Sequence, residues 1–132
     1  MRIVQPPGWP RPRGYSNAVT ASGRQLFVAG LIGWTAEERF EATDLPGQFE
    51  QILRNLLAIL AEAGAAPEHV ARMTWYITDK QAYLRDARRI GEIYRALMGR
   101  HYPVMAVVQV VALMEDAALI EIETTAVIPD DL

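Results

Sequence analysis

The 132-residue sequence contains no cysteine, which excludes disulfides, thiol nucleophiles and cysteine-ligated zinc or iron–sulfur clusters. It has only two histidines, His69 and His101, which are not part of a cluster with ligand-like spacing. We therefore expect no metal site and interpret both histidines as surface residues. Only one of the thirteen basic residues is lysine, and the formal net charge is −3, so the chain offers no basic excess to a phosphate backbone. These counts argue against metal chemistry and against nucleic-acid binding.

The sequence also lacks an apolar run long enough to span a bilayer. Its first residues, MRIVQPPGW, do not contain the apolar core of a signal peptide. We expect a cytoplasmic protein without a membrane partner. A length of 132 residues is typical of one domain around one hydrophobic core, so residues 1–132 are interpreted as a single domain.

Apolar spacing and turn residues predict the order strand, strand, helix, strand, helix, strand, strand. Prolines and glycines between Val4 and Tyr15 predict an irregular arm before the first strand. The predicted elements are a hairpin of strands 16–20 and 25–30, a helix over 48–63, a strand over 70–78, a helix over 81–98, and two strands between 102 and 127 joined by a turn at 114–117. Asp44 and Pro46 mark the start of the first helix, and Gly64 marks its end.

Alternation along the last strands predicts which side chains face the helices. Ile120, Ile122 and Thr124 share one face, which we assign to the helices, and Leu119, Glu121 and Glu123 share the other. Both faces of the preceding strand, 104–111, are apolar, which is typical of a strand that is buried on both sides. Because two helices can cover only one face, we expect other copies of the chain to cover the open face. Glu121 and Glu123 would then lie on or near a subunit boundary.

Short motifs occur in a fixed order along nearly the whole chain. They are Y-S-N-A-V from Tyr15, F-V-A-G at 27–30, L-A-E-A-G-A at 60–65, T-D at 78–79, and P-x-x-A-V-x-Q-V from Pro103, followed by I-E-I-E-T-T-A-V. Together they resemble the Rid family of reactive-intermediate (imine/enamine) deaminases, also named YjgF or L-PSP endoribonuclease. The resemblance implies an α+β, chorismate-mutase-like fold, with a mixed β-sheet and two helices on one face. It also implies a homotrimer with small-molecule ligand clefts at the subunit interfaces.

The resemblance implies hydrolysis of 2-imino or 2-enamino acids to 2-keto acids and ammonia, without a cofactor. In deaminating members the first Glu of the I-E-I-E strand holds the attacking water, and an Arg in the P-x-x-A-V motif binds the substrate carboxylate. These positions are Glu121, the candidate catalytic residue, and Met105 in this sequence. Met105 cannot neutralise a carboxylate, and the alternatives for that role are Arg13 from the arm and Arg100 before the strand.

The predicted substrate pocket is more apolar than the resemblance implies for deaminating members. Its candidate residues are Tyr15, Gly30, Leu31, Trp34, Met105, Val107 and Gln109. Leu31 and Trp34 replace more polar residues that are common after the turn glycine, and Gly91 stands where deaminating members usually have Asn.

Two functions remain open. The first is a Rid-type hydrolase in which Glu121 orients water toward an imine or enamine that is not a simple 2-imino acid. The second is a non-catalytic trimeric binding module, in which Met105 is core packing and Glu121 pairs with an arginine of a neighbouring subunit. Endoribonuclease activity has no support, since the chain has neither a basic groove nor paired histidines.

Overall fold

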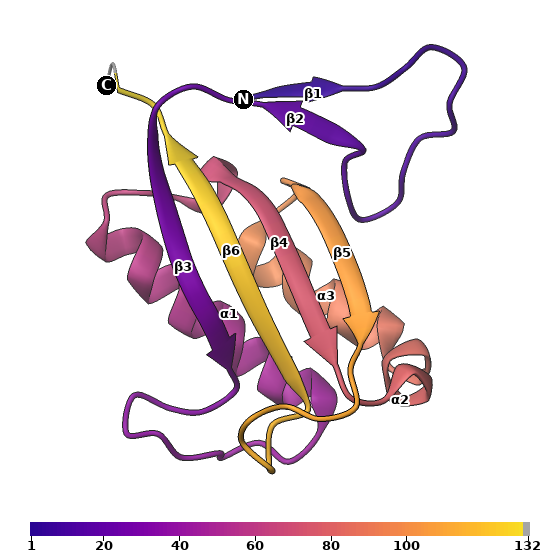
Figure 1. Ribbon diagram of the computed structural model, residues 1–132, viewed down its shortest axis with the longest axis vertical. Helices are drawn as coiled ribbons and strands as arrows, with labels where there is room; N and C mark the ends of the chain where they lie inside the picture. Colours follow the sequence, from indigo (N-terminus) through magenta and orange to yellow (C-terminus); the bar gives the residue numbers. More distant parts are fainter. Residues whose placement is uncertain (131–132) are drawn as a thin grey trace.

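A computed structural model describes residues 1–130 of the chain (Figure 1). Over these residues the strands are β1 (Arg2–Val4), β2 (Ala18–Thr20), β3 (Arg24–Ile32), β4 (Val70–Ile77), β5 (Val104–Gln109) and β6 (Ile120–Ile128). The helices are α1 (Leu45–Glu62), α2 (Lys80–Arg85) and α3 (Ala87–Met98), with one turn of 3-10 helix at Pro67–His69.

One mixed sheet organises the fold. Its strand order is β3-β6-β4-β5, in which β4 and β5 are parallel and the other neighbours are antiparallel. The parallel pair requires a crossover, which α2 and α3 provide. β1 and β2 form a separate two-stranded sheet at one end of the molecule (Figure 1). The predicted α+β fold with a mixed sheet is confirmed, and β3 and β5 are its outer strands.

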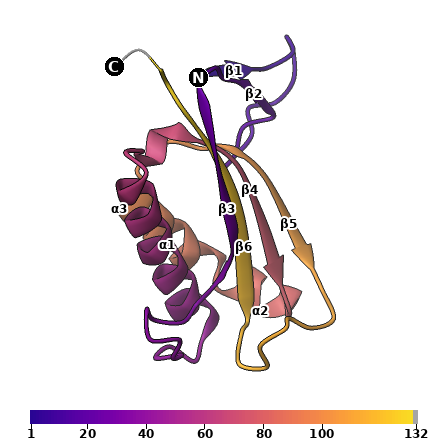
Figure 2. The ribbon, with the colours of Figure 1, turned by 60° about the vertical axis from the view of Figure 1, so that its left-hand side comes forward.

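The hydrophobic core lies between this sheet and the two longer helices, α1 and α3, which cover the same face (Figure 2). The opposite face carries no helix in the described part of the chain (Figure 2). The largest fully buried side chains come from α1 and the central strands, and include Phe49, Ile52, Leu53, Leu56, Leu60, Met73, Ile120 and Ile122. Two helices on one face is the predicted arrangement. None of the helices within residues 1–130 has the length and apolar character needed to cross a membrane.

The first long helix begins and ends at the predicted signals. Asp44 is its N-cap and accepts a hydrogen bond from the backbone N–H of Gly47, while Pro46 lies in the first turn. Gly64 follows the helix with a φ of +73°, a left-handed conformation that glycine adopts without a Cβ penalty. The helix is longer at its start than the predicted range 48–63, because the cap precedes Leu45 directly.

A buried glutamine in α1 fixes the start of β6. Gln48 is 1% exposed, and its Nε2 donates to the carbonyls of Ala42 (3.2 Å) and Ala117 (2.9 Å). Its Oε1 accepts from the backbone N–H of Leu119 at 2.8 Å. These three bonds satisfy a buried amide and hold the chain two residues before Glu121.

The predicted hairpin of strands 16–20 and 25–30 is wrong in its pairing. β2 pairs with β1 at the chain start, while β3 pairs with β6. The strands at the end of the chain are not neighbours either, because β4 lies between β5 and β6. Residues 114–117 do lie in the connection between them. Periodicity identifies strands but carries no information on which strands pair.

The predicted helix over 81–98 is interrupted at Asp86, which separates α2 from α3. Asp86 has φ −99° and ψ 9°, so it leaves helical geometry for one residue. Asp86 is the C-cap position of α2 and the N-cap position of α3, although its side chain makes no capping hydrogen bond to α3. Gly99 ends α3 as predicted, with a φ of +75°.

The predicted faces of the last strand are confirmed. Ile120, Ile122 and Thr124 are buried against the helices, whereas Glu121 and Glu123 lie on the open face. In β5, Met105 and Val107 pack against the core, while Val108, on the open face, is 42% exposed.

Candidate functional site

Glu121 lies on the open face of β6 beside a glycine in β3. The register between β3 and β6 shifts between Val28 and Leu31, so Gly30 lies in a β-bulge. A Cβ placed on Gly30 would overlap Oε2 of Glu121 and would lie 2.9 Å from its Cδ. The missing side chain at residue 30 therefore gives the carboxylate its space.

A tyrosine on the neighbouring strand lies opposite Glu121 and hydrogen-bonds to Glu123. Tyr76 pairs with Glu121 across β4 and β6, and its hydroxyl donates to Oε1 of Glu123 at 2.7 Å. This hydrogen bond to Glu123 is the main cause that raises the pKa of Tyr76, and the negative charges of Glu123 and Glu121 add to it. Glu123 thus has a partner within its own chain, which leaves Glu121 as the carboxylate available to a ligand or water.

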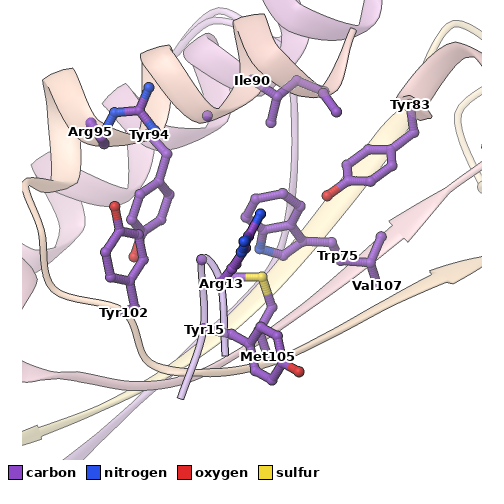
Figure 3. A pocket seen from close by; sticks show the side chains of 13 residues that line it. Arg13, Tyr15, Trp75, Tyr83, Ile90, Tyr94, Arg95, Tyr102, Met105 and Val107 are labelled. Carbon is purple, nitrogen blue, oxygen red and sulfur yellow. The ribbon is translucent and has the colours of Figure 1, made fainter. Parts of the chain in front are cut away.

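On the other side of the sheet, a cavity of about 430 Å³ lies between α3, β5 and the N-terminal arm (Figure 3). We name it the Met105 cavity, because Met105 and Val107 of β5 form part of its wall. Its volume lies in the usual range for small-molecule sites, roughly 300–1,000 Å³. Tyr15, one of the predicted substrate-binding residues, lines this cavity, and Arg13 reaches it from the same arm.

Aromatic rings form much of this wall. Tyr94 stacks on Tyr102 with centroids 5.6 Å apart, and Trp75 meets Tyr83 edge-on at 6.4 Å. The hydroxyl of Tyr94 donates to the carbonyl of His101 at 2.8 Å. Burial, and to a lesser extent the nearby Tyr102, raises the pKa of Tyr94 strongly, so this phenol stays protonated. The wall of the cavity is largely aromatic, which suits a ligand with a planar ring.

Leu31, Trp34 and Gln109, also predicted as pocket residues, lie outside this cavity. Leu31 packs against the core, and Trp34 contacts Phe40 with ring centroids 5.9 Å apart. The Oε1 of Gln109 accepts a hydrogen bond from the backbone N–H of Lys80 at 2.6 Å, at the start of α2. Each of these three side chains therefore contacts residues of its own chain outside the Met105 cavity.

The two arginines proposed as replacements for a missing guanidinium are separated by the structure. Arg13 lines the Met105 cavity, whereas Arg100 lines a neighbouring cavity between the arm and residues 100–102. Arg95 of α3 also lines the Met105 cavity. Within residues 1–130, no group of three or more His, Asp or Glu side chains is arranged as metal ligands.

Within one chain, Glu121 and the Met105 cavity do not meet. Gly30 and Glu121 lie on β3 and β6, while Met105 belongs to β5, which is separated from β6 by β4. The Glu121 side chain lies on the open face, and the cavity lies on the helix-covered side. The chain thus carries two candidate half-sites, an acidic one at Glu121 and an aromatic one at the Met105 cavity, on opposite faces of the sheet.

The mixed sheet with its helices on one face places the chain among small α+β proteins, and comparison with known proteins identifies its family. A family model described as Endoribonuclease L-PSP matches residues 10–128. A RutC family protein of Pyrococcus abyssi is 35% identical over 119 residues, which cover 89% of both chains. TdcF of Escherichia coli, named as a candidate reactive intermediate deaminase, is 33% identical over 108 residues, covering 80% of each chain.

Solved structures agree with this result. The Rid-family protein YyfB of Yersinia pestis superposes with a TM-score of 0.84 at 33% identity, covering 96% of this chain and 98% of YyfB. E. coli TdcF, solved with bound serine, gives a TM-score of 0.68 at 30% identity and covers 97% and 99% of the two chains. This chain belongs to the Rid family, which includes proteins named YjgF and L-PSP.

Several cavity residues were not among the site residues predicted from sequence. Tyr83, Ala87, Ile90 and Tyr94 form the apolar stripe of the predicted second helix, and that stripe lines the cavity as well as the core. Arg95 follows Tyr94 directly and is exposed, like many helix arginines. Nothing in the sequence therefore distinguishes it as a site residue. The stripe would have revealed the cavity only if the position of β5 beneath it had been known.

Proposed function

We propose that this protein is a cytoplasmic homotrimeric hydrolase of imines or enamines, with active sites at its subunit interfaces. The observation that carries this proposal is the separation of the two half-sites. Each cleft would combine the Met105 cavity of one subunit with Glu121 and Gly30 of the next. A head-to-tail contact of this kind closes into a ring when three copies are related by a threefold axis.

The open face of the sheet supports subunit association. Phe27 on β3 is 73% exposed and Val108 on β5 is 42% exposed, so both outer strands present apolar side chains to solvent in one chain. Burial in an interface stabilises such side chains by roughly 25 cal/mol per Å² of apolar surface. A trimer would cover this face while leaving polar groups such as Glu121 in a cleft.

The proposed reaction is addition of water to a C=N bond. Glu121 accepts a proton from the water as the water oxygen bonds to the imine carbon, and passes that proton to the nitrogen, giving a carbinolamine. Glu121 then accepts the proton of the carbinolamine hydroxyl as the C=O bond forms, and donates it to the nitrogen as the C–N bond breaks. The sum is imine plus water to ketone plus ammonia, with Glu121 regenerated.

The substrate is proposed to differ from a simple 2-imino acid. TdcF is solved with serine, a small molecule with a carboxylate beside its amine-bearing carbon. The position that the family resemblance assigns to the carboxylate anchor is Met105 in this chain, which offers no charge. Each charge-assisted hydrogen bond contributes about 1.5–3 kcal/mol, so its loss weakens binding of a small acid by roughly ten- to a hundredfold.

The test is hydrolysis of imines generated in situ. A lyase supplies 2-aminoacrylate, a flavin amine oxidase supplies the imine of benzylamine, which has no 2-carboxylate, and semicarbazide trapping measures the remaining imine. We expect faster decay of the aromatic imine than of 2-aminoacrylate, and loss of that acceleration in Glu121→Gln. Light scattering on the same samples should give the mass of a trimer.

Two outcomes would contradict the proposal. Equal decay with Glu121→Gln and with the wild-type protein would favour the non-catalytic binding module. Rates on 2-aminoacrylate within tenfold of a relative that has arginine at the Met105 position would show that another residue already anchors small imino acids.

A further inference from the structure

Two guanidinium groups border the Met105 cavity without an acidic partner. Arg13 comes from the arm and Arg95 from α3, and both residues are exposed. Within residues 1–130 the ion pairs are Arg54–Glu50 and Arg85–Asp86, so neither cavity arginine is paired. None of the described residues that line the cavity has a carboxylate. The mouth of this aromatic slot is therefore positively charged.

Gly91 brings one of these groups close to the helix. Gly91 and Arg95 are one turn apart on α3, and a Cβ at residue 91 would lie 3.4 Å from Nη1 of Arg95. With no side chain at residue 91, the guanidinium lies against the helix surface at the border of the cavity. A side chain at residue 91 would therefore compete with this guanidinium for the same space.

Trp75 supplies an independent sign of a ligand. Its side chain is buried, with 4% of the residue exposed, and it lies at the base of the cavity (Figure 3). Its Nε1–H has no hydrogen-bond partner in the described part of the chain. Most buried donors in folded proteins are paired, and a ligand acceptor atom beside Met105 would supply the missing partner. Figure 3 shows the indole nitrogen on the side of the ring toward Met105 and Arg13.

We propose that the Met105 cavity binds an aromatic carboxylate. The ring lies in the slot of Trp75 and the tyrosines, a carbonyl or imine-derived acceptor receives the hydrogen bond of Trp75 Nε1, and the carboxylate pairs with Arg13 and Arg95 at the mouth. The anionic anchor is then displaced from residue 105 to the arm and α3. Because this anchor lies on the arm and α3 and not at residue 105, we expect the carboxylate of the ligand to be several bonds away from its reactive carbon.

This ligand assignment deepens the proposed function, since the reactive carbon would face Glu121 of the next subunit. Binding by the cavity itself can be tested without turnover. A suitable probe is 3-benzoylpropionate, which has an aromatic ring, a ketone acceptor and a carboxylate separated from that ketone by two methylene groups. Its primary amide is the matched neutral probe, and pyruvate is the short 2-keto acid control.

Isothermal titration calorimetry on the intact protein should show binding of 3-benzoylpropionate at least about tenfold tighter than of its amide or of pyruvate. The double variant Arg13→Gln/Arg95→Gln should lose this preference for the acid while binding the amide as before. Arg88→Gln, which removes an exposed arginine of α3 outside the cavity, should bind like the wild-type protein. The preference should also weaken at high salt, because it is electrostatic.

The proposal is overturned by equal affinity for acid and amide, by no binding of either, or by an unchanged preference in the double variant. Glu121→Gln separates this inference from the proposed function. If that variant and the wild-type protein both bind the acid but neither hydrolyses imines, the proposed function fails and the ligand assignment stands. If Glu121-dependent hydrolysis is found but the arginine variants change neither binding nor rate, the ligand assignment alone fails.

Discussion

The carboxylate of Glu121 occupies the place that a side chain at Gly30 would fill. A Cβ at residue 30 would overlap Oε2 and approach Cδ to 2.9 Å and Cγ to 3.2 Å. The clash involves the far end of a flexible side chain, so the fold can accept it by moving the carboxylate. Gly30 thus controls where Glu121 points more than whether the chain folds.

Gly30→Ala should therefore lower imine hydrolysis by about a hundredfold while leaving the urea midpoint almost unchanged. A general base displaced by about 1 Å loses roughly this factor. The same substitution in the Glu121→Gln background should have no further effect on the rate. A large loss of stability, or an equal loss of rate in both backgrounds, would show that Gly30 acts through the fold.

Met105→Arg should increase hydrolysis of 2-aminoacrylate by about tenfold or more, because it places a guanidinium at the position that Met105 leaves neutral. The new charge lies in the same cavity as Arg13 and Arg95, so we expect a loss of about 1–2 kcal/mol in the free energy of unfolding. Semicarbazide trapping measures the first effect and urea unfolding the second. Met105→Leu keeps the volume without the charge and should not increase the rate.

Phe27→Asp should prevent assembly of the proposed trimer without unfolding the chain. Phe27 is 73% exposed within one chain, so its removal leaves no cavity in the core. A charge buried in a subunit interface is strongly unfavourable. Light scattering should show a shift toward the monomer, with unchanged far-UV circular dichroism. Leu84→Asp, on exposed α2, is the control and should remain a trimer.

Stability should fall with rising pH above about 10, and Tyr94 should contribute to the slope. Burial, together with Tyr102, raises the pKa of Tyr94 in the folded state, whereas an unfolded tyrosine ionises near pH 10. The stabilisation is therefore complete below pH 10 and is lost as pH rises toward the folded pKa. Each such group lowers the free energy of unfolding by about 1.4 kcal/mol per pH unit in this window.

Urea unfolding at fixed protein concentration between pH 9.5 and 11.5 measures this slope. Tyr94→Phe should reduce the slope by about 1.4 kcal/mol per pH unit, since one titrating group is removed. The same substitution should lower the free energy of unfolding by about 1 kcal/mol at neutral pH, because the hydrogen bond to the carbonyl of His101 is lost. If Tyr94→Phe and the wild-type protein have the same slope, Tyr94 ionises in the folded state over the same pH range as in the unfolded state.

The sequence predicted local structure better than strand partners. Asp44, Pro46 and Gly64 defined α1, and alternation placed Ile122 and Glu121 on the correct faces, because caps and side-chain direction are local properties. The pairing of β2 with β1 could not be predicted, since β1 has only three residues and shows no periodicity.

The same limit applies to the site. The sequence predicts both Glu121 and Met105 as site residues. Their separation depends on the order of the strands in the sheet, which the alternation of side chains along a strand does not predict. Arg95 and the unpaired N–H of Trp75 become meaningful only when α3 is placed over β5. Contacts between segments far apart in the chain determine such groupings.

The placement of the two candidate half-sites on opposite faces of the sheet has a genetic consequence. If each cleft takes its aromatic cavity from one subunit and Glu121 from the next, two inactive variants can complement each other. In randomly mixed trimers of Glu121→Gln with Arg13→Gln/Arg95→Gln, about one cleft in four would contain both intact halves. Co-expression should therefore restore about a quarter of the wild-type rate, whereas separately purified and unexchanged trimers should remain inactive.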